Sequence, residues 1–589
     1  MAHDLTTIAA SVPPQQALTS VCMSLGIFAA TIFVLELVYR RHVLRWFRTR
    51  RRMIELSLRL PGGAVGSSHK HPWMNDLGSV LSLDPVPGMP GYQMAVPWFV
   101  GAITRHAKEG EGLYRIAAFN PYRVPFARTM VVVFDPDLIE EILIGKVDKF
   151  PKSRHYKLAE ALVGDSFLAE PYGRAWKKQR RLCQPAFGQV TLDKTVEAST
   201  RILKEELFPI IDANPDCVDM ITYANRLTLD VLGEVSFSYP FDGVRSLAKL
   251  GHGAAASGRD GKDDGSLFYT FNYMILTIVH WARLPLRRLL PSGENRRYKM
   301  MSDCLNSVVQ SVVERRMSEQ DRAEQSEDGM PSQSRPGGNA RRGTDLLGHL
   351  LQRDADGKRM DMKHIIGNVR MFCFAGHETT SSTVSYALWH LASNTGAQER
   401  LRHEIDAAFF GSKVFGPSHS ELRKLRYLDA VIKEALRMNA PAPIGRTACK
   451  DVVIGGKKGK KRYQLPADCD ILIFPWWVHR QPSQWEDADE FRPERFLSDD
   501  KATGEEGGGR KGEGEGGLAP SHAYFPFSVG PRNCIGMQMA LTELRLILSY
   551  IVWRYEIGPA EGAADPVPYM GLTIQANKVL IRFRLRDGR

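Results

Sequence analysis

The chain has 589 residues, of which 43% are hydrophobic, and its formal net charge is +12. This length and composition exclude a single small domain and wholesale disorder, and they leave room for a large hydrophobic core. The positive charge does not by itself indicate nucleic acid, because seven arginines are concentrated between Arg40 and Arg52. We therefore interpret that cluster together with the segment before it, and we expect no nucleic-acid partner.

The segment before the cluster, residues 17–39, is apolar and contains no Lys or Arg and a single acidic residue, Glu36. A helix of this length would extend about 35 Å, enough to cross the hydrocarbon core of a bilayer. Because the basic residues follow the apolar segment instead of preceding it, the pattern differs from that of a cleaved signal peptide. We expect a single transmembrane helix with the following chain in the cytoplasm. A buried core helix is the alternative.

The composition also predicts the organisation of the remaining chain. Residues 1–16 form a short tail, residues 40–91 a basic stop segment with a Pro- and Gly-rich hinge, and residues 92–589 a globular domain. Three inserts in that domain are polar and either charged or rich in glycine, and we expect them to be disordered. They are 251–266, 318–343 and 499–517.

The globular domain is predicted to be mainly α-helical. Residues 129–143 combine a β-branched strand, a turn at Asp135–Pro136 and a helix. Strand-like segments are otherwise few and short, as at 451–456 and 469–474. Long amphipathic helices are predicted at 295–320, 362–393 and 420–438.

The eight cysteines show no CxxC pair and no regular spacing, which indicates reduced thiols in a cytosolic domain. One of them, Cys534, lies in the motif Phe527-x-x-Gly530-x-Arg532-x-Cys534-x-Gly536. Glycines allow a tight turn that aims backbone N–H groups at a thiolate, and a helix that begins after the cysteine adds its positive dipole. The aromatic ring could shield the sulfur, and the arginine could pair with an anionic group on a cofactor. A single cysteine cannot hold zinc or an iron–sulfur cluster alone, but it can be the only protein ligand of a haem iron.

This motif resembles the haem-binding loop of the cytochrome P450 superfamily, with all of its residue types at the spacings of that loop. The resemblance extends from near residue 92 to the end of the chain, although the three inserts depart from the usual spacing. It implies the mainly α P450 fold with a small sheet region, and haem b as the cofactor. It also implies that Cys534 is the axial ligand of the haem iron, in a binding loop that includes Arg532, Phe527, Gly530 and Gly536.

A second matching motif is AGHETT, residues 375–380, inside the apolar helix predicted at 362–393. An acid and a hydroxyl in the middle of such a helix are costly unless they have partners or a task. In P450s this helix crosses the haem face where oxygen binds, so the resemblance assigns Glu378 and Thr379 to proton delivery and lets Gly376 leave room beside the flat ring. The alternative is a threonine bonded to its own helix and a glutamate that faces solvent.

A third motif, Glu434-x-x-Arg437, places an acid and a base on one helix face. The resemblance pairs them with Arg495 of the segment FRPERF. The resulting triad is structural and not catalytic, because a buried ion network persists only if every member is paired.

A fourth motif, Trp176-x-x-x-Arg180, places an indole N–H and a guanidinium one helical turn apart, where both can reach a haem propionate. Arg446 lies where many P450s place another propionate partner. Close by, three basic residues either extend a basic face toward an acidic redox partner or are solvated surface charges: Lys177, Lys178 and Arg181.

The resemblance implies a monooxygenase, in which two electrons and O₂ place one oxygen atom in a C–H bond or an alkene and release the other as water. A membrane anchor without a fused flavin domain implies a separate NADPH–cytochrome P450 reductase, with cytochrome b5 as a second candidate partner. It also implies a single-pass protein of the endoplasmic reticulum membrane whose catalytic domain is cytosolic. Residues 267–286 are aromatic and apolar, and they form either a lipid-facing substrate entrance or a core helix. We expect a lipophilic substrate, which could be a fatty acyl chain, a sterol, a terpenoid or another secondary metabolite.

Two other functions stay open at this point. A reductase-independent haem-thiolate isomerase or dehydratase needs neither O₂ nor NADPH, and such relatives often lack the acid–threonine pair that Glu378 and Thr379 form here. A non-catalytic haem-binding sensor would have no use for that pair.

Overall fold

The structure is a computed structural model that describes residues 94–95, 112–118, 128–153, 156–168, 170, 172–249, 267–283, 291–327, 345–353, 357–409, 416–456, 460–497 and 523–586. The chain divides into two compact units, residues 1–60 and 61–589, and all described residues belong to the second. The predicted transmembrane segment 17–39 lies outside the described residues, as do the inserts 251–266 and 499–517. Within the described ranges, no helix has both the length and the hydrophobicity that crossing a membrane requires.

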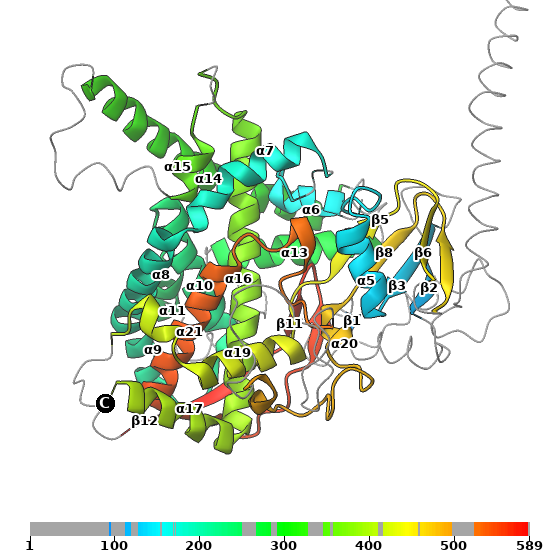
Figure 1. Cartoon of the computed structure of the whole chain (residues 1–589). Coiled ribbons are helices and arrows are strands. Elements are labelled where there is room, and N and C mark those ends of the chain that lie inside the picture. Colours follow the sequence, from blue (N-terminus) through cyan, green and yellow to red (C-terminus); the bar gives the residue numbers. More distant parts are fainter. Residues whose placement is uncertain are drawn as a thin grey trace, which may run out of the picture. The chain divides into compact units, whose positions relative to one another are not determined.

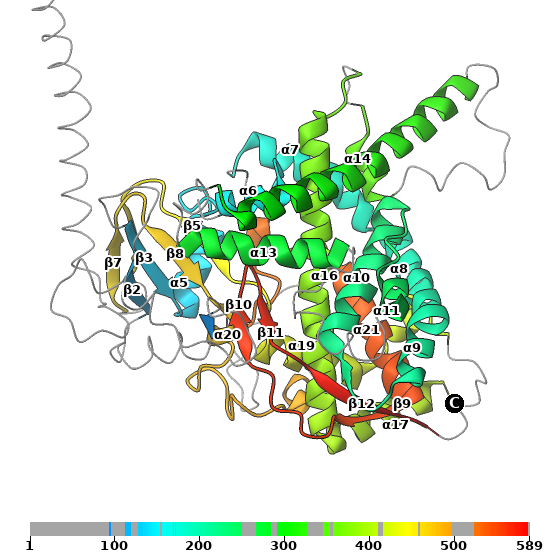
Figure 2. The same ribbon diagram turned by 180° about the vertical axis from the view of Figure 1, so that it is seen from behind.

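The described part is mainly α-helical, as predicted (Figures 1 and 2). Its longer helices are α8 (Gln189–Ile202), α10 (Met220–Phe237), α13 (Leu267–Arg283), α14 (Gly293–Glu327), α16 (Met362–Ser393), α17 (Thr395–Ala408), α19 (Arg426–Met438) and α21 (Met537–Arg554). The shorter ones are α5 (Pro136–Glu140), α6 (Tyr156–Val163), α7 (Arg174–Cys183), α9 (Phe208–Ala213), α11 (Gly243–Lys249), α15 (Leu346–Leu350), α18 (His419–Leu422) and α20 (Pro475–Val478).

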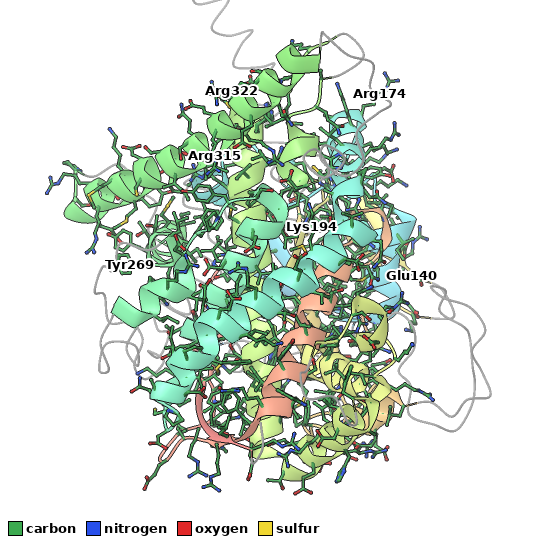
Figure 3. All side chains as sticks on the ribbon, turned by 90° about the vertical axis from the view of Figure 1, so that its left-hand side faces the viewer. Glu140, Arg174, Lys194, Tyr269, Arg315 and Arg322 are labelled. Carbon is green, nitrogen blue, oxygen red and sulfur yellow. The ribbon has the colours of Figure 1, made fainter. Side chains whose placement is uncertain are left out.

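Helix α16 runs through the helical body and packs against α10, α14, α19 and α21 (Figures 1 and 2). It begins where the Asp361 carboxylate accepts the backbone N–H of Lys363 at 3.0 Å, which satisfies one of the free donors of the first turn. Most of its side chains from Ile365 onward are buried, as are nearly all of those of α10. The charged ends of Arg174 on α7 and Arg315 on α14 point away from this core (Figure 3).

Twelve short strands form four small sheets in the described part of the chain. The largest has the order β2-β3-β8-β5, in which β3 and β8 are parallel and the other pairs antiparallel. Their bounds are β2 Leu113–Ala118, β3 Arg128–Val133, β8 Asp470–Ile473 and β5 Ile444–Thr447. The other sheets are β1-β10-β11 (Met94–Ala95, Pro568–Met570, Ile574–Ala576), β4-β12-β9 (Val218–Asp219, Leu580–Leu585, Tyr555–Pro559) and β6-β7 (Val452–Gly455, Arg462–Leu465).

One insert prediction was partly wrong. Helix α14 continues to Glu327, so the first part of the segment 318–343 is helical where we expected disorder. A side-chain contact supports the extension, because Arg359 donates to the carboxylate of Asp321 at 2.7 Å. The remaining insert residues, 328–343, lie outside the described residues.

The helix predicted at 420–438 is two helices, α18 and α19. Ser418 and Glu421 form a capping box that starts α18. The second helix, α19, starts where the Glu404 carboxylate of α17 accepts hydrogen bonds from the backbone N–H groups of Tyr427 at 2.7 Å and Leu428 at 2.9 Å. A partner from another helix therefore sets this boundary, and no local pattern revealed it.

Candidate functional site

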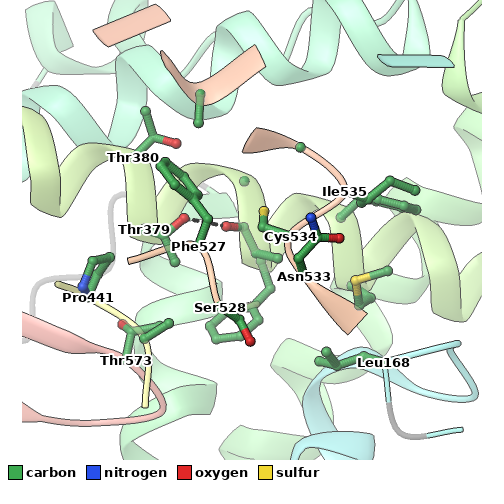
Figure 4. A pocket seen from close by; sticks show the side chains of 18 of the residues that line it. Leu168, Thr379, Thr380, Pro441, Phe527, Ser528, Asn533, Cys534, Ile535 and Thr573 are labelled. Atoms are coloured by element: carbon green, nitrogen blue, oxygen red, sulfur yellow. Dashed lines mark hydrogen bonds between the residues drawn. The ribbon is translucent and has the colours of Figure 1, made fainter. Parts of the chain in front are cut away.

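A cavity of about 310 Å³ lies among α7, α16, α21 and the turn between β10 and β11. Most of the side chains that line it are apolar, and Figure 4 shows part of the wall. Helix α16 contributes Phe374, Ala375, Gly376, Thr379, Thr380 and Thr383, and helix α21 contributes Met539, Ala540, Glu543 and Leu544.

The loop that carries Cys534 forms one wall of the cavity and leads directly into α21. It contains the 3₁₀ turn Gly530–Arg532. Gly530 has a φ of +76°, and a Cβ at this position would lie 2.6 Å from the carbonyl oxygen of Leu143, so the turn requires glycine. The backbone N–H of Cys534 donates to the carbonyl of Phe527 at 2.9 Å. The side chains of Phe527 and Cys534 both face the cavity (Figure 4).

The surroundings of the Cys534 sulfur act on its ionisation in opposite directions. The thiol is exposed to the cavity, yet burial by the surrounding protein raises its pKa. The backbone N–H of Gly536 and the charges of Arg180 and Lys152 oppose this effect and lower the pKa. Because Gly536 immediately precedes α21, its N–H belongs to the positive end of that helix. A negative sulfur is stabilised by these donors and charges.

Three cations gather on the side of the cavity near this loop. Lys152 and Arg532 line the cavity, and Arg446 is buried beside them without lining it. Burial lowers the pKa of Lys152, and the charges of the two arginines lower it further. For the same reasons the pKa of Arg532 falls to about 10. Within the described residues, none of the three forms an ion pair with a carboxylate, although the more distant charge of Glu170 raises the pKa of Arg532.

Buried positive charges without acidic partners are unfavourable unless an anion neutralises them. One terminal nitrogen of Arg532 and the Nε of Arg446 also lack a hydrogen-bond partner. A haem carries two carboxylates on one edge and needs one axial ligand from the protein. The cations, the single thiol and the apolar walls therefore fit a haem.

The structure places Trp176 and Arg180 next to the cysteine loop. The Trp176 side chain is buried, and its ring centre lies 5.6 Å from the guanidinium carbon of Arg180 and 4.8 Å from that of Arg532. Arg180 donates to the carbonyl oxygen of Asn533 at 2.8 Å and to its side-chain oxygen at 2.7 Å. The terminal nitrogens of Arg180 thus hold the residue that precedes Cys534, a contact that we did not predict.

Helix α16 presents Thr379 to the cavity, where its hydroxyl donates to the carbonyl of Ala375 at 2.7 Å (Figure 4). This bond of Thr379 to its own helix is the one that the alternative interpretation expected. Glu378 is buried, so the other half of that interpretation, a glutamate that faces solvent, is wrong, although Glu378 is not among the residues that line the cavity. Gly376 lines the cavity, and a Cβ there would meet the side chain of Leu232 at 2.9 Å.

Comparison with known proteins identifies the family. The model of the Cytochrome P450 family matches residues 123–583 of this chain. The chain belongs to the cytochrome P450 family. It is a haem-thiolate monooxygenase, and its cofactor is haem b with cysteine thiolate ligation.

Individual relatives of this P450 are distant. Cytochrome P450 4V2 from Homo sapiens is 29% identical over 435 residues, which cover 73% of this chain and 75% of that protein. Cytochrome P450 97B2, chloroplastic, from Glycine max is 26% identical over 525 residues, which cover 85% and 84%. The crystal structure of the cytochrome P450DA heme domain superposes with a TM-score of 0.62 at 23% identity and covers 83% of this chain and 93% of that chain. That similarity shows the P450 fold.

The ion network of this P450 joins α19 to a later loop. The Glu434 carboxylate accepts from Arg437 at 2.7 Å and from Arg495 at 3.0 Å. Arg437 also donates to the carbonyls of His479 at 3.0 Å and Ala488 at 2.7 Å. Because all members are buried and bonded to one another, the network joins separate segments and faces no substrate.

Two charged cavity residues of this P450 were not identified by the sequence analysis. Lys152 lies in an irregular segment after α5 that carries no motif. Glu543 is buried and lines the cavity, and one of its carboxylate oxygens has no hydrogen-bond partner. Its spacing from Met539 could have revealed it, because residues four apart share a helix face.

Proposed function

We propose that Cys534 is the axial ligand of the haem in this monooxygenase, and that Lys152, Arg446 and Arg532 neutralise the haem carboxylates. The observation that supports this most is a thiol that faces a cavity beside cations that form no ion pair with a carboxylate in the described part of the chain. The bound haem supplies the oxygen chemistry, in which two electrons reduce O₂ and one oxygen atom enters the substrate. The protein holds the sulfur as a thiolate through Gly536 and Arg180, and its apolar walls keep bulk water out.

The ligand assignment is tested by replacing Cys534 with Ala and recording the spectrum of the reduced, carbon-monoxide-bound protein. The parent protein should show the band that is characteristic of thiolate ligation, and Cys534→Ala should lose it. Cys449→Ala removes an exposed thiol elsewhere and serves as the matched control. If the band persists in Cys534→Ala, another residue binds the iron.

For proton delivery we propose Thr379, with Glu378 as the ionisable group beside it. The Thr379 hydroxyl donates a hydrogen bond to the carbonyl of Ala375, so its oxygen can accept a hydrogen bond from a water molecule and hold that water in place. Such positioned groups typically contribute roughly 10²–10⁴-fold to a proton-transfer step. Thr379→Ala should therefore consume NADPH with less product and more hydrogen peroxide. Undiminished product per NADPH would assign proton delivery to another group.

The finer functional assignments are also proposals. We propose that this P450 oxidises a fatty acyl, sterol, terpenoid or similar secondary metabolite, because apolar side chains dominate the cavity wall. We propose an NADPH–cytochrome P450 reductase as electron donor, with cytochrome b5 as an accessory, and docking against the exposed residues Lys177, Lys178 and Arg181 of α7. Lys178→Glu should weaken electron transfer from the reductase and reduce its salt dependence.

We further propose that residues 17–39 anchor the chain in the endoplasmic reticulum membrane with residues 92–589 in the cytosol. The support is the apolar length of that segment and the arginines that follow it. Protease added to sealed microsomes should digest the globular domain. Complete protection of the domain would show the opposite orientation.

A further inference from the structure

The turn between β10 and β11 brings a polar group to an apolar part of the cavity wall. Leu572 and Thr573 from this turn both line the cavity. Thr573 is 5% exposed, and its hydroxyl oxygen has no hydrogen-bond partner among the residues that the structure describes. Leaving a buried hydroxyl unpaired costs about 1–3 kcal/mol, so its presence on this wall needs an explanation.

Two threonines of α16 that line the cavity differ from Thr573, because their hydroxyls have hydrogen-bond partners. The hydroxyl of Thr379 donates to Ala375 at 2.7 Å, and that of Thr383 donates to the carbonyl of Thr379 at 3.0 Å. Their own helix therefore satisfies them. The other cavity groups without a partner, Ser528, Arg532 and Glu543, belong to the Cys534 loop and to α21, not to this turn.

The turn that carries Thr573 is fixed from both sides. The backbone N–H of Ile574 donates to the carbonyl of Pro441 at 2.7 Å, and the Ser382 hydroxyl of α16 donates to the carbonyl of Ile574 at 3.1 Å. Within the turn, the N–H of Gly571 donates to the carbonyl of Thr573 at 2.8 Å. The hydroxyl is thus held in one place, which reduces the entropy that a ligand loses by bonding to it.

The wall around this hydroxyl is apolar. Pro441 lies next to the turn, as Figure 4 shows, and Pro443 and Ile444 continue the same wall. A neutral hydroxyl in such surroundings can satisfy a neutral polar group, but it cannot offset the desolvation of a charged one. The group that forms the missing hydrogen bond with the Thr573 hydroxyl is therefore an uncharged donor or acceptor.

We infer that Thr573 binds a hydroxyl or carbonyl group of the substrate, so the substrate is an apolar molecule with a neutral polar group and not a plain hydrocarbon. This inference rests on the proposed function and narrows the substrate class. The bond determines which end of the substrate lies at the β10–β11 turn, and so which part of it faces Cys534. It predicts discrimination against analogues that lack the polar group, because they leave the hydroxyl unpaired.

The test measures equilibrium binding of matched probes by dialysis against the haem-loaded protein. The probes are dodecanol against dodecane, and cholestanol against cholestane. We expect the parent protein to prefer the alcohol in at least one pair. Thr573→Val should weaken binding of that alcohol about five- to ten-fold, a loss equivalent to about 1–1.4 kcal/mol, and leave the alkane unchanged. Thr573→Ser should restore the preference.

Thr383→Val removes a hydroxyl that is already satisfied, and it should not alter the ratio of the two affinities. No preference for the alcohol in either pair, or an unchanged ratio in Thr573→Val, overturns the inference. The result is separable from the proposed function, because dialysis needs neither electrons nor turnover. A failure of the ligand assignment would appear instead in the carbon-monoxide spectrum of Cys534→Ala.

Discussion

Single residues at this site are constrained by neighbours that lie far away in the chain. Gly530 combines a positive φ with a close approach to the backbone of Leu143. Glu543 is held in a buried position without a full set of partners. Each feature has a measurable consequence for stability.

Gly530→Ala should destabilise the fold by more than the cost of a left-handed residue alone. The added methyl group would lie 2.6 Å from the Leu143 carbonyl oxygen, and neither backbone can move freely. We expect a loss of about 2–4 kcal/mol in urea unfolding, together with reduced haem content. Gly562→Ala is the matched control, since Gly562 has a φ of +68° but nothing within 4 Å of its added methyl. Equal losses in the two variants would show that the contact with Leu143 is unimportant.

Glu543→Gln should change how stability depends on pH. Burial raises the pKa of Glu543 well above its ordinary value of 4.5, so the folded chain keeps a proton that the unfolded chain releases. The contribution of Glu543 to the unfolding free energy of the parent is fully present below a pH of about 4.5, and it is lost as the pH rises through the pKa of the folded state. The variant should therefore gain stability over the parent as the pH rises above about 4.5, measured by thermal unfolding. Glu556→Gln, on exposed strand β9, should show no such trend. A pH-independent difference for Glu543→Gln would contradict the burial argument.

At the scale of elements, the contacts that matter join segments that are separate in sequence. Glu434 on α19 binds Arg495 of the turn Pro493–Phe496, which precedes the insert 499–517 and the cysteine loop in the sequence. Because α19 also packs against α16 and α21, this network helps to hold the elements that carry the cavity wall.

Glu434→Ala should be strongly destabilising. It leaves Arg437 and Arg495 buried without their carboxylate, and removing one partner of a buried ion network costs about 3–5 kcal/mol. The loss is measured as a lower urea midpoint with an unchanged slope. As a control, Arg315→Ala breaks the exposed pair with Glu319 on α14 and should cost less than about 1 kcal/mol. Similar losses for the two variants would mean that the network contributes no more than a surface ion pair.

The sequence predicted features whose cause is local. The Cys534 loop, the helix 362–393 and the strand–turn–helix at 129–143 depend on residue types at short spacing, and the structure has these elements there. Lys152 could not be found in this way, because its role comes from strands and loops that bring it beside Arg446 and Arg532. The break before α19 likewise depends on Glu404 of another helix.

At the scale of the whole molecule, folding and cofactor binding are linked through the cations of the site. Burial of the Lys152 charge destabilises the folded chain when no anion is bound, and under the proposed assignment the haem carboxylates would make Lys152 a binding contact. Lys152→Met should therefore raise the unfolding free energy of haem-free protein by about 1–2 kcal/mol. The same variant should release haem faster to an apomyoglobin acceptor, with affinity falling tenfold for each 1.4 kcal/mol lost. If Lys152→Met raised or lowered both the unfolding free energy and the haem affinity, Lys152 would not be a contact of the haem carboxylates.

The contact between Arg180 and Asn533 has a consequence for communication across the protein. Arg180 lies on α7, whose exposed residues include Lys177, Lys178 and Arg181. A displacement of α7 would therefore also move Asn533, because the Arg180 guanidinium is hydrogen-bonded to that residue. Any protein that binds α7 more tightly in one arrangement of this loop must also favour that arrangement, since coupling between two sites is reciprocal. Helix α7 thus connects an exposed surface to the residue beside Cys534, so a partner bound on that surface and the arrangement of the cysteine loop would influence each other.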